Sequence, residues 1–167
     1  MKSGAKKVYA VDVGYGQFDY ALRNDERVVL MERQNARFLT GDMFEDSIDM
    51  AVIDCSFISL KLIIPAAIDL LAAVGEIVAL IKPQFEAGKD KVGKRGVVKD
   101  PDTHIQVIEE ICAFAGNNGL AVLGLICSPV KGPNGNIEYL IYLSKDAEKN
   151  NKKLNINQIV LTAHEDL

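Results

Sequence analysis

The chain has 167 residues, of which 49% are hydrophobic and 25% are charged, and its formal net charge at pH 7 is −4. This composition predicts a soluble globular domain with its own core and excludes a disordered or fibrous chain. The longest apolar region, residues 60–81, is interrupted by Lys61, Asp69 and Glu76, so we expect no membrane span.

The cysteines and histidines indicate a reducing compartment and no metal site. Cys55, Cys112 and Cys127 form no CxxC pair, and no secretory signal is visible at the start of the chain. We therefore expect a cytoplasmic protein with free thiols. His104 and His164 are far apart in the sequence and have no ligand spacing around them, so we expect no bound metal.

The first half of the chain alternates apolar strands with one helix. In chain order the predicted elements are a strand over residues 8–12, a strand over 28–31, a strand over 49–57, a helix over 59–73 and a strand over 76–81. Ser59 is placed to cap the helix, and Lys82-Pro83 ends the last of these strands.

The second half begins with a glycine- and lysine-rich segment, and a helix and two strands follow. In chain order we predict a loop over residues 84–99, a helix over 101–114, strands over 120–127 and 137–143, a polar linker over 146–153 and a short helix over 156–164. A short turn-rich connection without a helix joins the last two strands. We therefore expect these strands to be antiparallel.

Strands that are apolar throughout and alternate with helices predict a mostly parallel sheet that is covered on both faces. Adding a terminal antiparallel strand gives the layout of Rossmann-like α/β methyltransferases, although other α/β folds share it.

The segment 82–99 is basic on a chain that is acidic overall. It carries six basic residues against two acidic ones, a local charge of +4: Lys82, Lys89, Lys91, Lys94, Arg95 and Lys99 against Glu86 and Asp90. A loop of this kind is typical of a phosphate contact. A solvated, flexible loop has the same pattern, and charge alone does not separate the two.

Three polar residues stand at the ends of apolar strands. Asp54 lies in AVIDCSFISL, Lys82 in VALIKPQFE and Glu138 in GPNGNIEYLIYL. Because the carboxyl ends of parallel strands converge on the ligand crevice, we expect these side chains to meet there. An Asp, a Lys and a Glu in one partly dry crevice suit a deprotonation. Taken singly, a strand-end Asp often caps the next helix and a strand-end Lys is usually solvated.

The segments VDVGYGQ, VIDCSFISL, LIKPQFE, VGKRGVV and SPVKGPNGNIEYL, in this order, resemble the hemolysin A (TlyA) family of FtsJ-like methyltransferases. The resemblance covers the chain to about Ser144. It implies a Rossmann-like fold, S-adenosylmethionine as cofactor, and 2′-O-methylation of RNA in ribosomal RNA or a ribosomal subunit.

The resemblance also implies roles for individual residues. The family uses a Lys-Asp-Lys-Glu tetrad, whose Asp matches Asp54, whose second Lys matches Lys82 and whose Glu matches Glu138. Lys82 would then activate the ribose 2′-hydroxyl, while Asp54 and Glu138 hold and tune it.

The cofactor residues implied by the resemblance lie in the first quarter of the chain. Asp12 matches the acid that binds the cofactor ribose hydroxyls, and Asp42, with Met43 beside it, resembles the acid near the adenine. Gly14 and Tyr15 are expected to line the same edge.

The chain departs from the family pattern at its start. Members begin with an S4-like RNA-binding domain, the first tetrad Lys, and a first strand with a glycine-rich loop, whereas this chain opens at MKSGAKKVYAVD, which resembles the end of the first helix and the second strand. We therefore expect residues 1–146 to be an incomplete methyltransferase domain, impaired in activity and cofactor affinity, and residues 147–167 to be a linker and short helix.

The loss of a central strand predicts a gap in the sheet, self-association through unpaired edges, or an exposed apolar surface. An alternative takes VDVGYGQ itself as the glycine-rich loop, with Glu32 as the ribose-binding acid, and requires residues 8–12 at the centre of the sheet. Two other functions remain to be weighed. The first is a non-catalytic RNA- or partner-binding module. The second is membrane lysis, which an amphipathic basic helix or a span would indicate.

Overall fold

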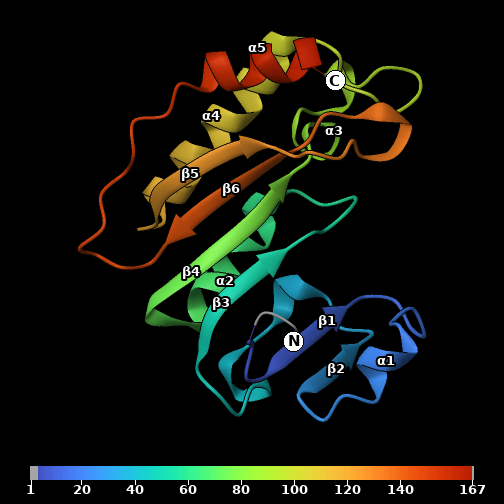
Figure 1. Cartoon of the computed structure of the whole chain (residues 1–167), viewed down its shortest axis with the longest axis vertical. Helices are drawn as coiled ribbons and strands as arrows, with labels where there is room; N and C mark the ends of the chain where they lie inside the picture. Colours follow the sequence, from blue (N-terminus) through green and yellow to red (C-terminus); the bar gives the residue numbers. More distant parts are fainter. Residues whose placement is uncertain (1–3, 167) are drawn as a thin grey trace.

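The computed structural model describes residues 4–166, and its elements follow one another in the predicted order (Figure 1). The strands are β1 (Val8–Asp12), β2 (Val28–Glu32), β3 (Ile48–Ile53), β4 (Leu71–Ile81), β5 (Ala121–Cys127) and β6 (Tyr139–Ser144). The α-helices are α1 (Tyr20–Arg23), α2 (Ile64–Leu70), α3 (Pro83–Glu86), α4 (Pro101–Asn117) and α5 (Ile156–Asp166). Short 3-10 helices cover Ala36–Phe38, Gly41–Met43, Leu60–Leu62, Lys89–Lys91 and Pro133–Gly135.

These strands form two separate sheets. β1 and β2 pair in parallel, while the second sheet has the order β3-β4-β6-β5. β3 and β4 are parallel, and β6 is antiparallel to both of its neighbours. In Figure 1 the arrow of β6 therefore points opposite to the arrows of β4 and β5. The predicted mostly parallel sheet with a terminal antiparallel strand is confirmed, and so is the antiparallel pairing of the last two strands.

The expected gap in the sheet lies between β1 and β3. Within residues 4–166, β1 pairs only with β2, and β3 pairs only with β4. Side chains still connect the two parts, since Lys7 forms an ion pair with Asp46 at 2.7 Å and the Tyr9 hydroxyl donates to Asp46 at 2.8 Å. The alternative with VDVGYGQ as the glycine-rich loop is wrong, because it required β1 at the centre of a sheet.

One face of the four-stranded sheet forms the core. Ile77, Ala79 and Ile81 of β4 alternate with half-buried residues and are fully buried, together with Ile141 and Leu143 of β6. Side chains of α2, α4 and α5 belong to the same buried cluster. The period-two burial follows from successive strand residues pointing to opposite faces.

The opposite face, which we call the open face, contradicts the expectation of a sheet covered on both sides. Met50 is 49% exposed, Val52 is 75% exposed and Ile126 is 59% exposed, although all three are apolar. Their neighbours on this face, Val78 and Leu140, are only half-buried. Apolar strand residues predicted two buried faces, but a strand sequence does not say which elements are present to cover each face. The expected exposed apolar surface is confirmed here.

Several predicted boundaries were wrong. The strand over 49–57 ends at Ile53. The helix over 59–73 is a 3-10 helix followed by α2, which ends at Leu70, and the chain is extended from Leu71 onward. Leu71 pairs with Ile48, and a short apolar run fits a strand as well as a helix. The predicted Ser59 cap is confirmed, since its side chain accepts from the Lys61 amide. Residues 84–99 are not loop throughout, because they include α3 and the 3-10 helix Lys89–Lys91.

Within the described residues, no helix is both long enough and apolar enough to cross a membrane.

The two histidines, distant in sequence, lie together where α5 packs on α4. Their rings have centroids 4.7 Å apart. The fully buried His104 has Nε2 at 2.9 Å from the carbonyl oxygen of Val98 and Nδ1 at 2.9 Å from the Tyr139 hydroxyl. Because a carbonyl only accepts, the bonding pattern assigns the proton of a neutral His104 to Nε2.

We expect the open face to cause self-association that a charge weakens. Val52→Lys places an ammonium on this face, whereas Val130→Lys changes a residue of similar exposure, 70%, in the loop after β5. Sedimentation velocity over a concentration series should show association of the wild type and the Val130→Lys variant, and less association of Val52→Lys. A wild-type chain that stays monomeric at every concentration contradicts the prediction.

We also expect stability to fall in weak acid. Burial lowers the pKa of His104 from its ordinary 6.5, the charge of His164 lowers it further, and the Val98 carbonyl and Asp100 oppose these effects. Burial likewise lowers the pKa of His164, against the opposing charge of Asp100. Since the unfolded histidines bind protons that the folded ones resist, the free energy of unfolding should decrease from about pH 7.5 to about pH 5.5.

Urea unfolding at a series of pH values measures this slope. His164→Gln should make the slope shallower, because one of the two histidines is removed. An unfolding free energy that does not change across this pH window would show that the histidines do not titrate as argued.

Candidate active site

Lys82 directly follows β4, and its side chain is 10% exposed. Its Nζ lies 2.6 Å from Oδ1 of Asp54 and donates to the Ser56 hydroxyl at 3.2 Å. Asp54 directly follows β3, which runs parallel to β4, so the carboxyl ends of two neighbouring strands supply both charges. The side chain of Asp54 is 67% exposed, which places the ion pair at the protein surface rather than in the core.

Glu138 lies opposite Lys82 across the β4–β6 pair. The last register pair is Ile81 with Tyr139, and Lys82 follows it on one strand while Glu138 precedes it on the other. Glu138 is 4% exposed and accepts a hydrogen bond from Nε2 of Gln84 at 2.8 Å. The topology therefore brings Asp54, Lys82 and Glu138 to one edge of the sheet, with Asp54 bonded to Lys82 and Glu138 bonded to Gln84.

The Glu138 carboxylate rests against the backbone of Gly132. A Cβ at Gly132 would lie 2.2 Å from Oε1 of Glu138 and 2.5 Å from its Cδ. The φ angle of Gly132 is −72°, which any residue adopts, so space rather than backbone conformation requires glycine here. The Gly132 amide donates to the carbonyl of Asn136 at 2.8 Å, which closes the loop around the carboxylate.

The sequence analysis missed two further residues that shape the site. Gln84 has a buried Oε1 with no hydrogen-bond partner among the described residues, beside the amide nitrogen that contacts Glu138. Glu86 accepts from the Ser59 hydroxyl at 2.6 Å and from the Leu60 amide at 2.7 Å. It thereby ties the segment after Lys82 to the segment after Asp54. The sequence signal for these two residues was the spacing of the polar side chains in KPQFE, because the one-turn helix α3 brings Gln84 to Glu138 and Glu86 to Ser59.

Phe57 is a third residue that the sequence analysis missed. It is 90% exposed and has a φ of 62°, a conformation that is costly for a bulky side chain. Its ring centroid lies 5.0 Å from that of Phe85. Nothing in the sequence pattern distinguishes this phenylalanine from a core residue, because its exposure depends on the turn that follows β3.

Asp12 occupies the corresponding position at the end of β1. Its Oδ1 accepts from the Gly14 amide at 2.6 Å, and its carbonyl accepts from the Gln34 amide at 3.0 Å. Burial raises the pKa of the Cys55 thiol, and the charges of Asp54 and Asp12 raise it further, while Lys82 opposes them. The charges of Asp12 and Asp54 therefore act on the same thiol, although β1 and β3 belong to separate sheets.

The other predicted cofactor residues are solvent-accessible but are not joined to Asp12 by any contact among the described residues beyond the Gly14 amide. Tyr15 is 67% exposed, and the Arg33 guanidinium lies 4.4 Å from its ring centroid. Asp42 accepts from the Thr40 hydroxyl in the 3-10 helix Gly41–Met43. Met43 is 42% exposed. Their aromatic, carboxylate and thioether groups are available at the surface near β1 and β2.

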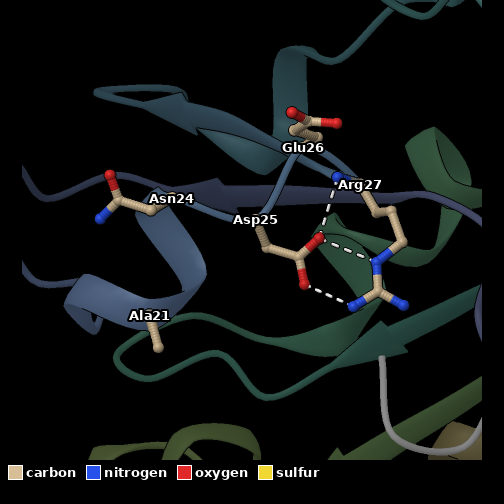
Figure 2. Close-up of a pocket in the computed structure, with 5 residues that line it drawn as sticks. All are labelled: Ala21, Asn24, Asp25, Glu26 and Arg27. Atoms are coloured by element: carbon tan, nitrogen blue, oxygen red, sulfur yellow. Dashed lines mark hydrogen bonds and ion pairs between the residues drawn. The ribbon is translucent and has the colours of Figure 1, made fainter.

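A surface hollow at the turn between α1 and β2 lies away from these residues (Figure 2). Asp25 accepts from the Arg27 guanidinium through Nε at 2.8 Å and Nη2 at 2.6 Å, and the same guanidinium lowers the pKa of Asp25 to about 2. Figure 2 shows that this closed pair occupies one wall of the hollow. The charges of Asp25 and Arg27 are therefore matched within this pair.

The fold and the site define a class of protein. A solved S-adenosylmethionine-dependent methyltransferase from Methanosarcina mazei matches 84% of this chain and 82% of its own, with a TM-score of 0.57 at 15% identity, a likeness of fold alone. The chain thus has the Rossmann-like fold of these methyltransferases. Residues 1–145 match the model of the FtsJ-like methyltransferases, and the chain belongs to that family.

Three relatives are much more similar. A candidate rRNA methyltransferase of Bacillus subtilis, YqxC, is 48% identical over 86% of this chain and 51% of its own. The 16S/23S rRNA (cytidine-2′-O)-methyltransferase TlyA of Mycobacterium tuberculosis is 43% identical over 87% of this chain and 54% of its own. A solved candidate hemolysin from Streptococcus thermophilus has a TM-score of 0.94 at 44% identity, covering 99% of this chain and 60% of that one.

The chain therefore spans about half the length of the curated relatives that it matches. The resemblance to the hemolysin A (TlyA) family is confirmed by these relatives and by the family match.

We predict that Gly132→Ala displaces the Glu138 carboxylate and destabilises the fold by about 1–3 kcal/mol, since overpacking forces neighbouring groups to move. Gly116→Ala is the matched control, because a Cβ there meets no atom within 4 Å outside its own helix backbone. Alanine in a helix is favoured over glycine, so the control should be neutral or slightly stabilising. Urea unfolding compares the variants, and equal stability of Gly132→Ala and wild type would show that Glu138 is not held by this contact.

Proposed function

We propose that this chain is the catalytic part of an S-adenosylmethionine-dependent methyltransferase that modifies a ribose 2′-hydroxyl of ribosomal RNA. The observation that carries the proposal is the nearly buried Lys82 ammonium, held 2.6 Å from Asp54 and opposite Glu138 at the sheet edge. Relatives named rRNA (cytidine-2′-O)-methyltransferases, such as that of Mycobacterium tuberculosis, support the substrate class. A ribosomal substrate also favours the cytoplasm.

Lys82 is placed to act on the 2′-hydroxyl. Nζ is paired with the Asp54 carboxylate and donates to the Ser56 hydroxyl, so the ammonium is oriented before the substrate arrives and can donate a further N–H to the substrate oxygen. An ammonium in a partly dry crevice stabilises negative charge that develops on that oxygen. The neighbouring carboxylates are acceptors for the departing proton.

Asp54 and Glu138 serve different purposes in this arrangement. Asp54 is two-thirds exposed, so it can contact solvent and substrate while it holds Lys82. Glu138 is almost fully buried between Gln84 and Gly132, so its position is fixed. The buried Oε1 of Gln84 has no hydrogen-bond partner among the described residues, so Gln84 is held in the site only through its bond to Glu138. A fixed acceptor and an oriented cation define where the ribose must lie.

The residues at the ends of β1 and β2 fit the cofactor. S-adenosylmethionine, when bound, supplies an electrophilic methyl group. Oδ1 of Asp12 already accepts from Gly14, which orients the carboxylate and leaves Oδ2 for ribose hydroxyls. Exposed Tyr15 and Met43 provide apolar surface for an adenine ring, with Asp42 as a hydrogen-bond acceptor beside it. The charges of Asp12 and Asp54 both raise the pKa of the Cys55 thiol, which supports a site that includes both carboxylates.

The experiment separates cofactor binding from chemistry with two variants. Ligand-observed NMR with S-adenosylhomocysteine, which detects weak complexes, should show binding to the wild type and to Lys82→Ala but not to Asp12→Ala. Methyl transfer to ribosomal RNA, read by mass spectrometry of 2′-O-methylated nucleosides, should fall by about 10²–10⁴-fold in Lys82→Ala. Lys61→Ala is the control, since Lys61 pairs with the distant Glu110 at the surface.

Two outcomes contradict the proposal. Wild-type chain that binds no more S-adenosylhomocysteine than Asp12→Ala does not use the predicted cofactor residues. Methylation that survives in Lys82→Ala removes Lys82 from the reaction. RNA binding without any cofactor binding would instead support the non-catalytic module.

A further inference from the structure

The glycine- and lysine-rich segment contains a built turn with two cations at its tip. The Gly96 amide donates to the Gly93 carbonyl at 2.8 Å, and the Gly93 amide donates to the Val97 carbonyl at 3.0 Å. Gly96 has a φ of +73°, which a side chain would disfavour. We call Gly93–Gly96 the basic turn, because Lys94 and Arg95 lie between its two glycines.

Polar side chains hold the basic turn against the rest of the protein. Asn136, which is 2% exposed, donates to the Gly96 carbonyl at 2.9 Å and accepts from the Val98 amide at 3.2 Å. The amide of Asn134 donates to the Arg95 carbonyl at 3.0 Å. The buried His104 holds the Val98 carbonyl. A merely solvated loop needs no such anchors, so these contacts favour the phosphate-contact interpretation of this segment over the flexible one.

The cationic groups of the turn are exposed and available. Lys94 and Arg95 form no ion pair within residues 4–166, whereas Lys7, Arg27 and Lys61 are each paired with a carboxylate. Two unpaired positive charges are thus fixed on a chain whose net charge is −4. Such a patch attracts an anionic partner even though the whole chain does not.

The basic turn also lies one loop away from the proposed catalytic residues. Asn136, its main anchor, is two residues before Glu138, and Gly132 of the same loop touches the Glu138 carboxylate. If the target ribose of an RNA strand lies at Lys82 and Glu138, the phosphates next to that ribose therefore lie near this loop.

We propose that the basic turn is a phosphate-binding element that holds the RNA backbone beside the target nucleotide; this inference rests on the proposed function. The Arg95 guanidinium can bind a phosphate through two parallel hydrogen bonds, and Lys94 adds a point charge. Because Asn134, Asn136 and His104 have already ordered the backbone, little further ordering is needed when RNA binds.

The test is the salt dependence of RNA binding. Fluorescence anisotropy of a fluorescein-labelled RNA hairpin is measured over a salt series for wild type and for the double variant Lys94→Gln, Arg95→Gln. Loss of two phosphate contacts should reduce the slope of log affinity against log salt by about two. The control is the double variant Lys152→Gln, Lys153→Gln, which removes the same charge from a different exposed segment. These two lysines form no ion pair within residues 4–166. Its slope should match that of wild type.

A second variant tests the anchoring. Asn134 has a φ of 58°, so Asn134→Gly keeps the backbone conformation and removes only the hydrogen bond to Arg95. It should weaken RNA binding while both cations and the thermal midpoint of unfolding are retained.

Three results overturn the inference: an unchanged slope in the Lys94, Arg95 variant, an equal reduction in the control, or wild-type binding to phosphatidylserine vesicles but not to RNA. Cofactor binding by NMR is independent of these readouts. If the chain binds the cofactor analogue but fails the anisotropy test, the proposed function stands and phosphate binding by the basic turn is rejected. The opposite pattern removes the proposed function and leaves the basic turn as a phosphate-binding element with no target nucleotide beside it.

Discussion

The ammonium of Lys82 is the group on which the rest of the site depends. A charge with one-tenth of its side chain exposed needs a counter-charge and hydrogen-bond partners, because its desolvation is otherwise unfavourable. The parallel pairing of β3 and β4 supplies Asp54 from the neighbouring strand end, and the antiparallel β6 returns Glu138 to the same edge. A single charged group after β4 is thus surrounded by the ends of three strands, and these are the residues that we propose to act on the 2′-hydroxyl.

The same topology also explains the exposed apolar face and the missing backbone pairing between β1 and β3. β4 and β6 are covered on one face and form the core, but the open face leaves Val52 and Ile126 in contact with solvent. β1 and β3 are joined by side-chain contacts around Asp46 rather than by a ladder of backbone bonds. The proposed cofactor half of the site, at Asp12, is therefore on a small two-stranded sheet that polar contacts around Asp46 connect to the rest of the chain.

The sequence predicted the strand-end residues and missed the residues between them. Asp54, Lys82 and Glu138 interrupt apolar runs, and the convergence of strand ends follows from strand direction alone. Gln84 and Glu86 lie in a segment without periodicity, and the one-turn helix α3 brings them to Glu138 and Ser59. The exposure of Phe57 depends on a positive φ that no local pattern announces. The expectation of a sheet covered on both faces was wrong, since apolar residues describe a strand and not what covers it, whereas the missing central strand correctly predicted an exposed apolar surface. His104 and His164, separated by sixty positions, meet only because α5 packs on α4.

The loop from Gly132 to Asn136 gives the site and the basic turn a common support. Gly132 leaves room for the Glu138 carboxylate, and Asn136, four residues later, bonds to the backbone on both sides of Val97. A displacement of this loop must therefore move a proposed catalytic carboxylate and a pair of cations together. Such coupling suits an enzyme whose substrate is a polyanion, because the group that positions the ribose and the groups that hold adjacent phosphates keep a fixed spacing. It also explains why the segment GPNGN, which has no apolar pattern and no charge, carries two glycines and two asparagines: the first glycine provides space, the asparagines provide hydrogen bonds, and Gly135 adopts the positive φ of 86° that closes the turn.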